Sequence, residues 1–271
     1  MKPALFVRDI DLIKKICLEE LEHFSDRVKL FDKEFDSVIG NILVNRTGKE
    51  WQAMRSSLNP AFVSSRTKHF FDLISECAET FANHFVNENK SLVEIQLNET
   101  FSKFDNDVIS SVCFGISSDS LEDDDNEFFK MHKKLKSFGA FQKLKLSLIQ
   151  LCPLLAKTFF KNIVIATMQK RESENINRPD FIDYLMKLRK KTFVEELGLN
   201  DAADHELEIR QPGERSKFAL LEIKLLFFHL LSKFDLVPTI KTNPVLNLTR
   251  FDVNVVGHTF LGLKPRKVTS L

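Results

Sequence analysis

The chain has 271 residues, of which 43% are hydrophobic, and its 26 phenylalanines are enough to help fill the core of one or two globular domains. Its 39 basic and 38 acidic side chains leave a formal net charge of +1, which argues against the basic surface that a nucleic-acid partner requires. The four cysteines are scattered and form no C-x-x-C pair, so the sequence favours reduced thiols facing the cytosol over a zinc or redox site.

Apolar residues recur with the period of a helix along most of the chain, which predicts a mainly α fold with minor β structure. A short strand is expected at residues 4–7. Helices are expected at residues 11–18, 51–58, 68–86, 101–113, 127–138, 144–160 and 179–190.

Prolines and a glycine set the ends of several of these helices. Asn59-Pro60 ends the second one, because the residue before a proline avoids the helical region. Gly115 is a typical C-terminal stop for the helix before it. Pro153 is expected to break or kink its helix, whereas Pro179 suits the first turn of the helix that follows it.

The last third of the chain changes character twice. Residues 191–217 are crowded with acidic side chains and contain the turn-forming Gln211-Pro212-Gly213, which is typical of a linker. Residues 218–234 are apolar nearly all round, so this helix is expected to be buried. Glu222 and Lys224 interrupt it, which leaves it too polar to span a bilayer.

The only tryptophan of the chain, Trp51, lies four residues before Arg55. Neighbours at that spacing lie over each other on one face of a helix. The indole N–H of Trp51 and the guanidinium of Arg55 then form a pair of donors suited to a carboxylate. The alternative is a buried tryptophan beside a surface arginine on an amphipathic helix.

With Gly48 before it and Leu58-Asn59-Pro60-Ala61-Phe62 after it, this pair resembles the W-x-x-x-R helix of cytochromes P450, in which the two side chains hold a haem propionate. The amino-acid sequences of the matching segments are most similar to those of the microsomal P450s of insects. The resemblance implies a partial cytochrome P450 fold with Trp51 and Arg55 as haem-binding residues. Further blocks are similar to the family in the same order, at residues 2–9, 23–27, 107–115, 178–186, 218–224 and 258–266, the last of which resembles the family's C-terminal strand.

Three elements that the family uses in catalysis have no counterpart here. Fewer than thirty residues separate Arg189 from Phe218, and at about 1.5 Å per helical residue they cannot contain two long helices and a ligand loop. The chain has no Ala-Gly dipeptide, no E-x-x-R and no cysteine after Cys152. The oxygen-activating helix with its A-G-x-x-T element, the E-x-x-R helix and the cysteine-ligand loop are therefore predicted to be absent.

The resemblance then divides the chain into three parts. Residues 1–190 form the N-terminal part of a P450 domain, residues 191–217 an atypical junction, and residues 218–271 the C-terminal part. Cys113-Phe114-Gly115 has the Cys-x-Gly form of the ligand loop, but it lacks the preceding Phe-x-x-Gly and ends an apolar helix. A free cysteine on such a face is usually a small core residue, so we expect no metal ligand and no catalytic residue.

The resemblance implies a haem-thiolate monooxygenase, which oxidises apolar small molecules such as xenobiotics with O₂ and with electrons from NADPH-cytochrome P450 reductase. Phe138, Phe141, Phe159 and Phe160 fall where the family places an apolar roof over its substrate, although ordinary core packing is the simpler interpretation of each. Such enzymes lie at the cytosolic face of the endoplasmic reticulum membrane. Met1 directly precedes the expected strand, so the N-terminal anchor is expected to be missing and only peripheral membrane contact remains.

Without an iron ligand, the chain as written is predicted to be catalytically inactive although its family is enzymatic. The alternative hypothesis is a non-catalytic, truncated product of splicing or gene modelling, either inert or a helical interaction module. In that case the 218–234 helix has lost its usual partners, and we expect a large exposed apolar surface.

Overall fold

The computed structural model describes residues 5–20, 23–24, 26, 29, 38–62, 64–123, 125–141, 151–196, 214–242 and 259–266. The chain divides into two compact units, Met1–Pro60 and Ala61–Leu271. The predicted mainly α fold with minor β structure is confirmed, because helices dominate both units and three short strands form a sheet. The division into parts 1–190, 191–217 and 218–271 stays a prediction.

The first unit begins with a short helix, α1, at Ile10–Lys14. The carboxylate of Asp9 caps it by accepting a hydrogen bond from the amide of Leu12 at 2.8 Å. A π-helical turn continues it to Glu19, so the helix predicted at residues 11–18 is confirmed. The strand predicted at residues 4–7 is wrong over its described residues 5–7: Leu5 and Phe6 are 87% and 85% exposed, and within the described ranges no strand pairs with them.

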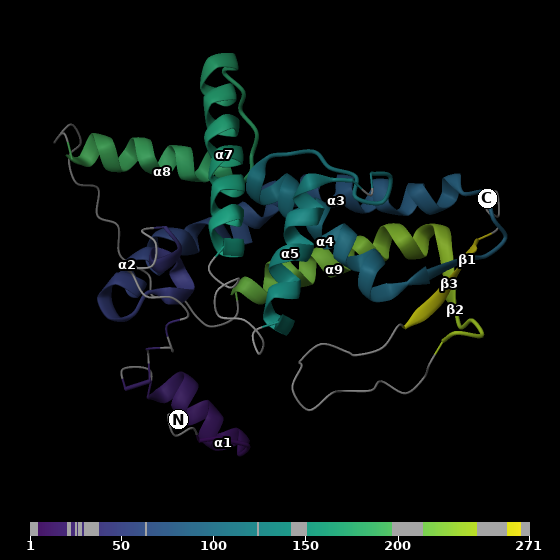
Figure 1. Cartoon of the computed structure of the whole chain (residues 1–271), viewed down its shortest axis with the longest axis horizontal. Coiled ribbons are helices and arrows are strands. Elements are labelled where there is room, and N and C mark those ends of the chain that lie inside the picture. The colour runs from purple at the N-terminus through teal and green to yellow at the C-terminus, as the bar shows by residue number, and fades with distance from the viewer. Residues whose placement is uncertain are drawn as a thin grey trace. The chain divides into compact units, whose positions relative to one another are not determined.

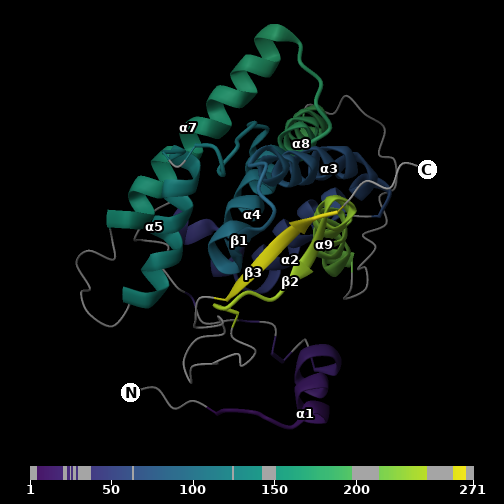
Figure 2. The same cartoon turned by 90° about the vertical axis from the view of Figure 1, so that its right-hand side faces the viewer.

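The second unit contains six long helices within the described ranges, and Figures 1 and 2 show them from two sides. Each of the helices predicted from apolar periodicity is present, and most ends shift by a few residues, but the helix predicted at residues 144–160 extends to Glu174. They are α3 at Ser64–Asn87, α4 at Leu97–Phe114, α5 at Glu127–Phe141, α7 at Leu151–Glu174, α8 at Phe181–Glu196 and α9 at Glu214–Lys233.

The largest core of this unit lies where α3 packs against both α4 and α9 (Figure 1). Each helix contributes one apolar stripe, as the helical period requires. Representative side chains are Ile74 from α3, Phe104 and Val108 from α4 and Leu230 from α9, all of them at most 1% exposed. Residues that are far apart in the sequence, from the beginning and the end of the unit, therefore share one core.

The sheet covers one end of this core. Its strands are β1 at Val93–Gln96, β2 at Phe234–Val237 and β3 at Phe260–Pro265, in the order β1-β3-β2, with both pairs antiparallel. Figure 2 shows β3 lying between its two neighbours. The C-terminal strand expected at residues 258–266 is confirmed over β3, whereas β1 and β2 were not predicted.

The two proline predictions are wrong in position. Pro153 lies in the first turn of α7, where its missing N–H costs nothing, and the helix continues unbroken to Glu174. Pro179 lies two residues before α8, and Asp180 caps that helix by accepting a hydrogen bond from the amide of Asp183 at 3.0 Å. The segment of the 144–160 prediction at residues 144–150 lies outside the described residues.

Helix α9 is buried on one side only, so the prediction of burial all round is wrong. Leu225, Leu226 and Leu230 face the core, whereas Leu220, Ile223 and Phe228 are 50%, 52% and 68% exposed. The predicted exposed apolar surface is confirmed on this helix. No helix in the described part of the chain is both long and apolar enough to cross a membrane.

Candidate functional site

The predicted haem-binding pair lies on α2, at Gly48–Leu58 in the first unit. Gly48 begins the helix with φ at +55°, a conformation that glycine adopts without strain, and its amide donates to the carboxylate of Asp26 at 2.8 Å. The α-helix ends at Leu58, as predicted, but the predicted reason is wrong: Asn59 lies in the right-handed helical region, and a 3-10 turn continues the chain through Pro60 to Phe62.

Trp51 and Arg55 are both half-buried. This differs from the alternative interpretation, in which a buried tryptophan lies beside a surface arginine. Their spacing of four residues places both side chains on the same side of α2. Among the described residues, no hydrogen bond occupies the indole N–H of Trp51 or the guanidinium of Arg55. Two donors on one helical face fit a single carboxylate, which is the chemistry predicted for them.

The described cysteines do not fit the iron of a haem-thiolate centre. Cys17 is exposed on the π-helical turn that follows α1. Burial raises the pKa of the Cys77 thiol to about 11, and it raises the pKa of Cys113 to about 11 with smaller contributions from Glu222 and Asp180. Both thiols lie inside helices, α3 and α4, rather than in a loop that could present a thiolate to iron.

The Cys-x-Gly sequence at Cys113 is therefore no ligand loop in this fold. Cys113 lies in the last turn of α4 and packs at the edge of the core, and Gly115 is the left-handed residue that ends the helix, with φ at +66°. No group of three or more metal-binding side chains occurs in the part of the chain that the structure describes. Among the described residues, Trp51 and Arg55 fit a carboxylate of the haem edge, whereas Cys17, Cys77 and Cys113 do not fit its iron.

A cluster of buried charges that the sequence did not reveal joins three helices of the second unit. Asp180, at the start of α8, accepts hydrogen bonds from Arg171 on α7 and from Arg178. Arg178 also donates to the carbonyl oxygen of Ser111 on α4 at 2.5 Å and to its hydroxyl at 2.8 Å. These arginines tie the C-terminal half of α4 to the α7–α8 corner. The position of Asp180 just before an apolar helix was the available signal for its capping role.

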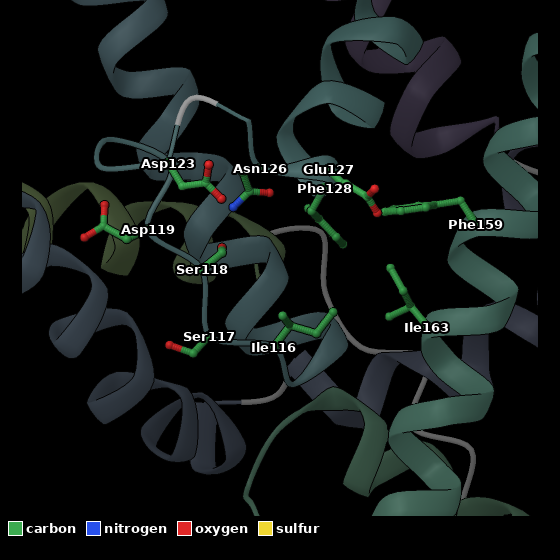
Figure 3. Close-up of a pocket in the computed structure, with 10 residues that line it drawn as sticks. All are labelled: Ile116, Ser117, Ser118, Asp119, Asp123, Asn126, Glu127, Phe128, Phe159 and Ile163. Atoms are coloured by element: carbon green, nitrogen blue, oxygen red, sulfur yellow. The ribbon is translucent and has the colours of Figure 1, made fainter.

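An open pocket lies in the same unit, between the α4–α5 loop, the first turn of α5 and α7 (Figure 3). Its volume is about 390 Å³. Its lining combines apolar and acidic side chains: Ile116, Ser117, Ser118, Asp119, Asp123, Asn126, Glu127, Phe128, Phe159 and Ile163. Phe159 was expected either over a substrate or in the core. It lines part of this pocket and packs against Phe160 at 5.2 Å between ring centroids. The side chains of Phe138 and Phe141 lie outside the described residues.

Comparison with known proteins assigns the family. The cytochrome P450 family model matches residues 1–216. Cytochrome P450 9e2 of Blattella germanica is 32% identical over 223 residues, which cover 72% of this chain and 42% of that protein. Probable cytochrome P450 9h1 of Drosophila melanogaster is 31% identical over 241 residues, which cover 83% of this chain and 45% of that protein. The chain thus spans less than half the length of these curated relatives. It belongs to the cytochrome P450 family.

Proposed function

We propose that this chain derives from a haem-thiolate monooxygenase that inserts one oxygen atom from O₂ into apolar small molecules. Electrons come from NADPH through cytochrome P450 reductase, at the cytosolic face of the endoplasmic reticulum. Membership of the cytochrome P450 family supports this proposal, and the similarity to P450s of two insects agrees with the microsomal type.

The residues that we assign to the cofactor are Trp51 and Arg55. Both offer N–H donors from the same side of α2, and a propionate is the carboxylate that haem presents at its edge. In this role the two side chains bind and orient the cofactor; they neither ligate iron nor transfer protons.

We further propose that the chain as written does not perform this chemistry. The A-G-x-x-T and E-x-x-R elements are absent from its sequence, and Cys77 and Cys113 are held as neutral thiols inside α3 and α4. The single observation that carries this proposal is that the sequence has no cysteine after Cys152, where the family places its axial ligand, because an axial thiolate is a requirement of the family's chemistry.

The second candidate is a non-catalytic helical interaction module. The observation that favours it is the exposed apolar face of α9, at Leu220, Ile223 and Phe228. Exposed apolar patches on soluble proteins commonly mark surfaces that contact other molecules.

Titration of the purified chain with haemin, followed by a reduced-plus-CO difference spectrum, separates these possibilities. We expect no thiolate-type Soret band, and its appearance would show that an unexpected cysteine ligates iron.

The propionate assignment has its own test: Arg55→Gln should weaken binding of haemin but leave binding of haemin dimethyl ester unchanged, since the ester has no carboxylate to pair. Lys49→Gln, which removes an exposed charge from the same helix, is the matched control. Equal losses for haemin and its ester would contradict the assignment.

A further inference from the structure

We propose that the pocket between the α4–α5 loop, α5 and α7 binds small organic cations with an apolar body, such as arylalkylammonium ions. This site is separate from Trp51 and Arg55 and does not depend on haem. Figure 3 shows Phe159 and Ile163 extending from α7 toward Phe128 and Glu127 at the start of α5, whereas Asp119 on the loop points away from them.

The apolar wall is fixed before any ligand arrives. Phe128 is only 7% exposed, and its ring packs against Phe114 at 5.1 Å, Phe160 at 5.4 Å and Phe159 at 6.2 Å between centroids. Phe159 and Ile163 lie one turn apart on α7, so both face the same side of that helix. A wall held by four packed rings loses little conformational entropy on binding.

The polar side of the pocket is also held in place. Asp107 on α4 accepts hydrogen bonds from the hydroxyl of Ser118 at 2.8 Å and from that of Ser120 at 2.6 Å. Its second oxygen accepts the amide N–H of Ser120 at 2.9 Å. The loop is therefore anchored on both sides of Asp119, whose own carboxylate points away from Phe159 and Ile163 (Figure 3).

The charged lining residues of the pocket have one sign, although Lys130 on α5, which pairs with Asp125 at 2.7 Å, also interacts with Asp123 and Glu127 and partly offsets their charge. Three of its ten described lining residues are acidic, Asp119, Asp123 and Glu127, and none of the ten is basic. The turn hydrogen bonds of Asp119 and Asp123 use Oδ1 of each carboxylate. A cation with an aromatic or alkyl body would place its charge near Asp123 and Glu127 and its body on Phe159, whose ring face also attracts a cation; the buried Phe128 only supports this wall.

The volume agrees with a ligand of this size. At about 390 Å³ the pocket falls at the lower end of the range for small-molecule sites. Because the rim is exposed to solvent, each carboxylate contributes modestly and in a salt-dependent way. We therefore expect weak binding with a preference for the charge, rather than tight binding.

The test compares 2-phenylethylammonium with 2-phenylethanol, which has a similar body but no charge, by calorimetry and ligand-observed NMR on the full chain. The ammonium ion should bind roughly five- to tenfold more tightly, given the sizes of exposed ion pairs and cation–π contacts. The double variant Asp123→Asn/Glu127→Gln should remove most of that preference, and Glu174→Gln, an exposed carboxylate at the end of α7, should leave it unchanged.

A second variant tests the apolar wall without emptying it. Phe159→Leu keeps most of the volume but removes the aromatic face, and it should weaken binding of both probes while circular dichroism shows the fold intact. Equal affinity for the two probes, no detectable binding of either, or affinities that none of the pocket variants changes would each overturn the proposal.

Discussion

Arg171 and Asp180 form a buried, two-point ion pair at the corner between α7 and α8. Arg171 Nη1 donates to Oδ1 of Asp180 at 2.7 Å, and Nη2 donates to Oδ2. The two side chains are 5% and 0% exposed. Arg178 adds a second ion pair to Oδ2 at 2.9 Å. One carboxylate thus compensates two guanidinium groups and caps a helix at the same time.

Asp180→Asn should destabilise the second unit by about 3–5 kcal/mol, because removal of one partner leaves the buried charge of Arg171 uncompensated. Denaturant titration measures the change in the free energy of unfolding. Asp183→Asn, which removes only a surface pair with Lys187, is the control and should cost less than about 1 kcal/mol. Similar losses for the two variants would show that the buried pair has no special role.

The same pair predicts an acid-dependent loss of stability. Burial alone raises the pKa of the Asp180 carboxyl, but hydrogen bonds from Arg171, from the amide of Asp183 and from Arg178 outweigh it and hold the pKa below its usual value. A depressed folded-state pKa stabilises the fold above the unfolded pKa, and this contribution is lost as the pH falls through the folded pKa. The unfolding midpoint of Asp180→Asn should therefore depend less on acid than that of the unmodified chain.

Gly115→Ala should be costly for two reasons. The residue has φ at +66°, which costs about 1–2 kcal/mol for a residue with a Cβ. The added Cβ would also lie 2.1 Å from Nη2 of Arg171 and 2.8 Å from Oδ2 of Asp180. Displacing a charge-assisted hydrogen bond adds about 1.5–3 kcal/mol. The total, measured by denaturant titration, should reach roughly 2.5–5 kcal/mol.

Gly48 is the matched control for that substitution. Its φ is +55°, but no atom lies within 4 Å of the position of a Cβ. Gly48→Ala should therefore carry only the backbone strain of about 1–2 kcal/mol. If the two alanine variants lose the same free energy, the contact between Gly115 and the ion pair is unimportant.

Most helices were predictable because their apolar stripes report the helical period over three or more turns, as in α3 and α4. The strands β1 and β2 were not, because each has four residues and exists only through pairing with β3, which is distant in sequence. The Arg171–Asp180 pair depends on the angle between two helices, which no local pattern encodes. The helix that carries Trp51 and Arg55 was predicted correctly from the sequence, whereas a haem propionate as the ligand of these two side chains stays a prediction.

Glu222 on α9 predicts a stability loss in the neutral range. Burial, and to a smaller extent the carboxylate of Asp105 on α4, raises the pKa of its carboxyl from 4.5 to about 7. Between these values the folded chain retains a proton that the unfolded chain has released, so stability falls by up to about 1.4 kcal/mol per pH unit as the pH rises. The stabilising contribution is complete below about pH 4.5 and lost above about pH 7.

Glu222→Gln should flatten this part of the profile and stabilise the chain at pH 8. Unfolding midpoints between pH 5 and 8 measure the effect. Glu79→Gln, which changes an exposed carboxylate on α3, should leave the profile unaltered. A profile that keeps its slope in Glu222→Gln would assign the pH dependence to another group.

The exposed face of α9 predicts binding of a hydrophobic dye and association at high concentration. Ile223→Gln/Phe228→Gln should reduce dye fluorescence and association, because both side chains are more than half exposed and contribute apolar surface. The free energy of unfolding of this double variant should change little. Surface substitutions usually change it by no more than about 0.5 kcal/mol each, and glutamine is a good helix former.

Leu230→Ala provides the opposite comparison on the same helix. Leu230 is fully buried, so its truncation should cost about 2–5 kcal/mol and raise dye binding by loosening the core between α3, α4 and α9. The two variants separate surface from core: the glutamine pair lowers dye binding at constant stability, and the alanine lowers stability. Dye binding that persists unchanged in the glutamine pair would place the accessible apolar surface elsewhere on the molecule.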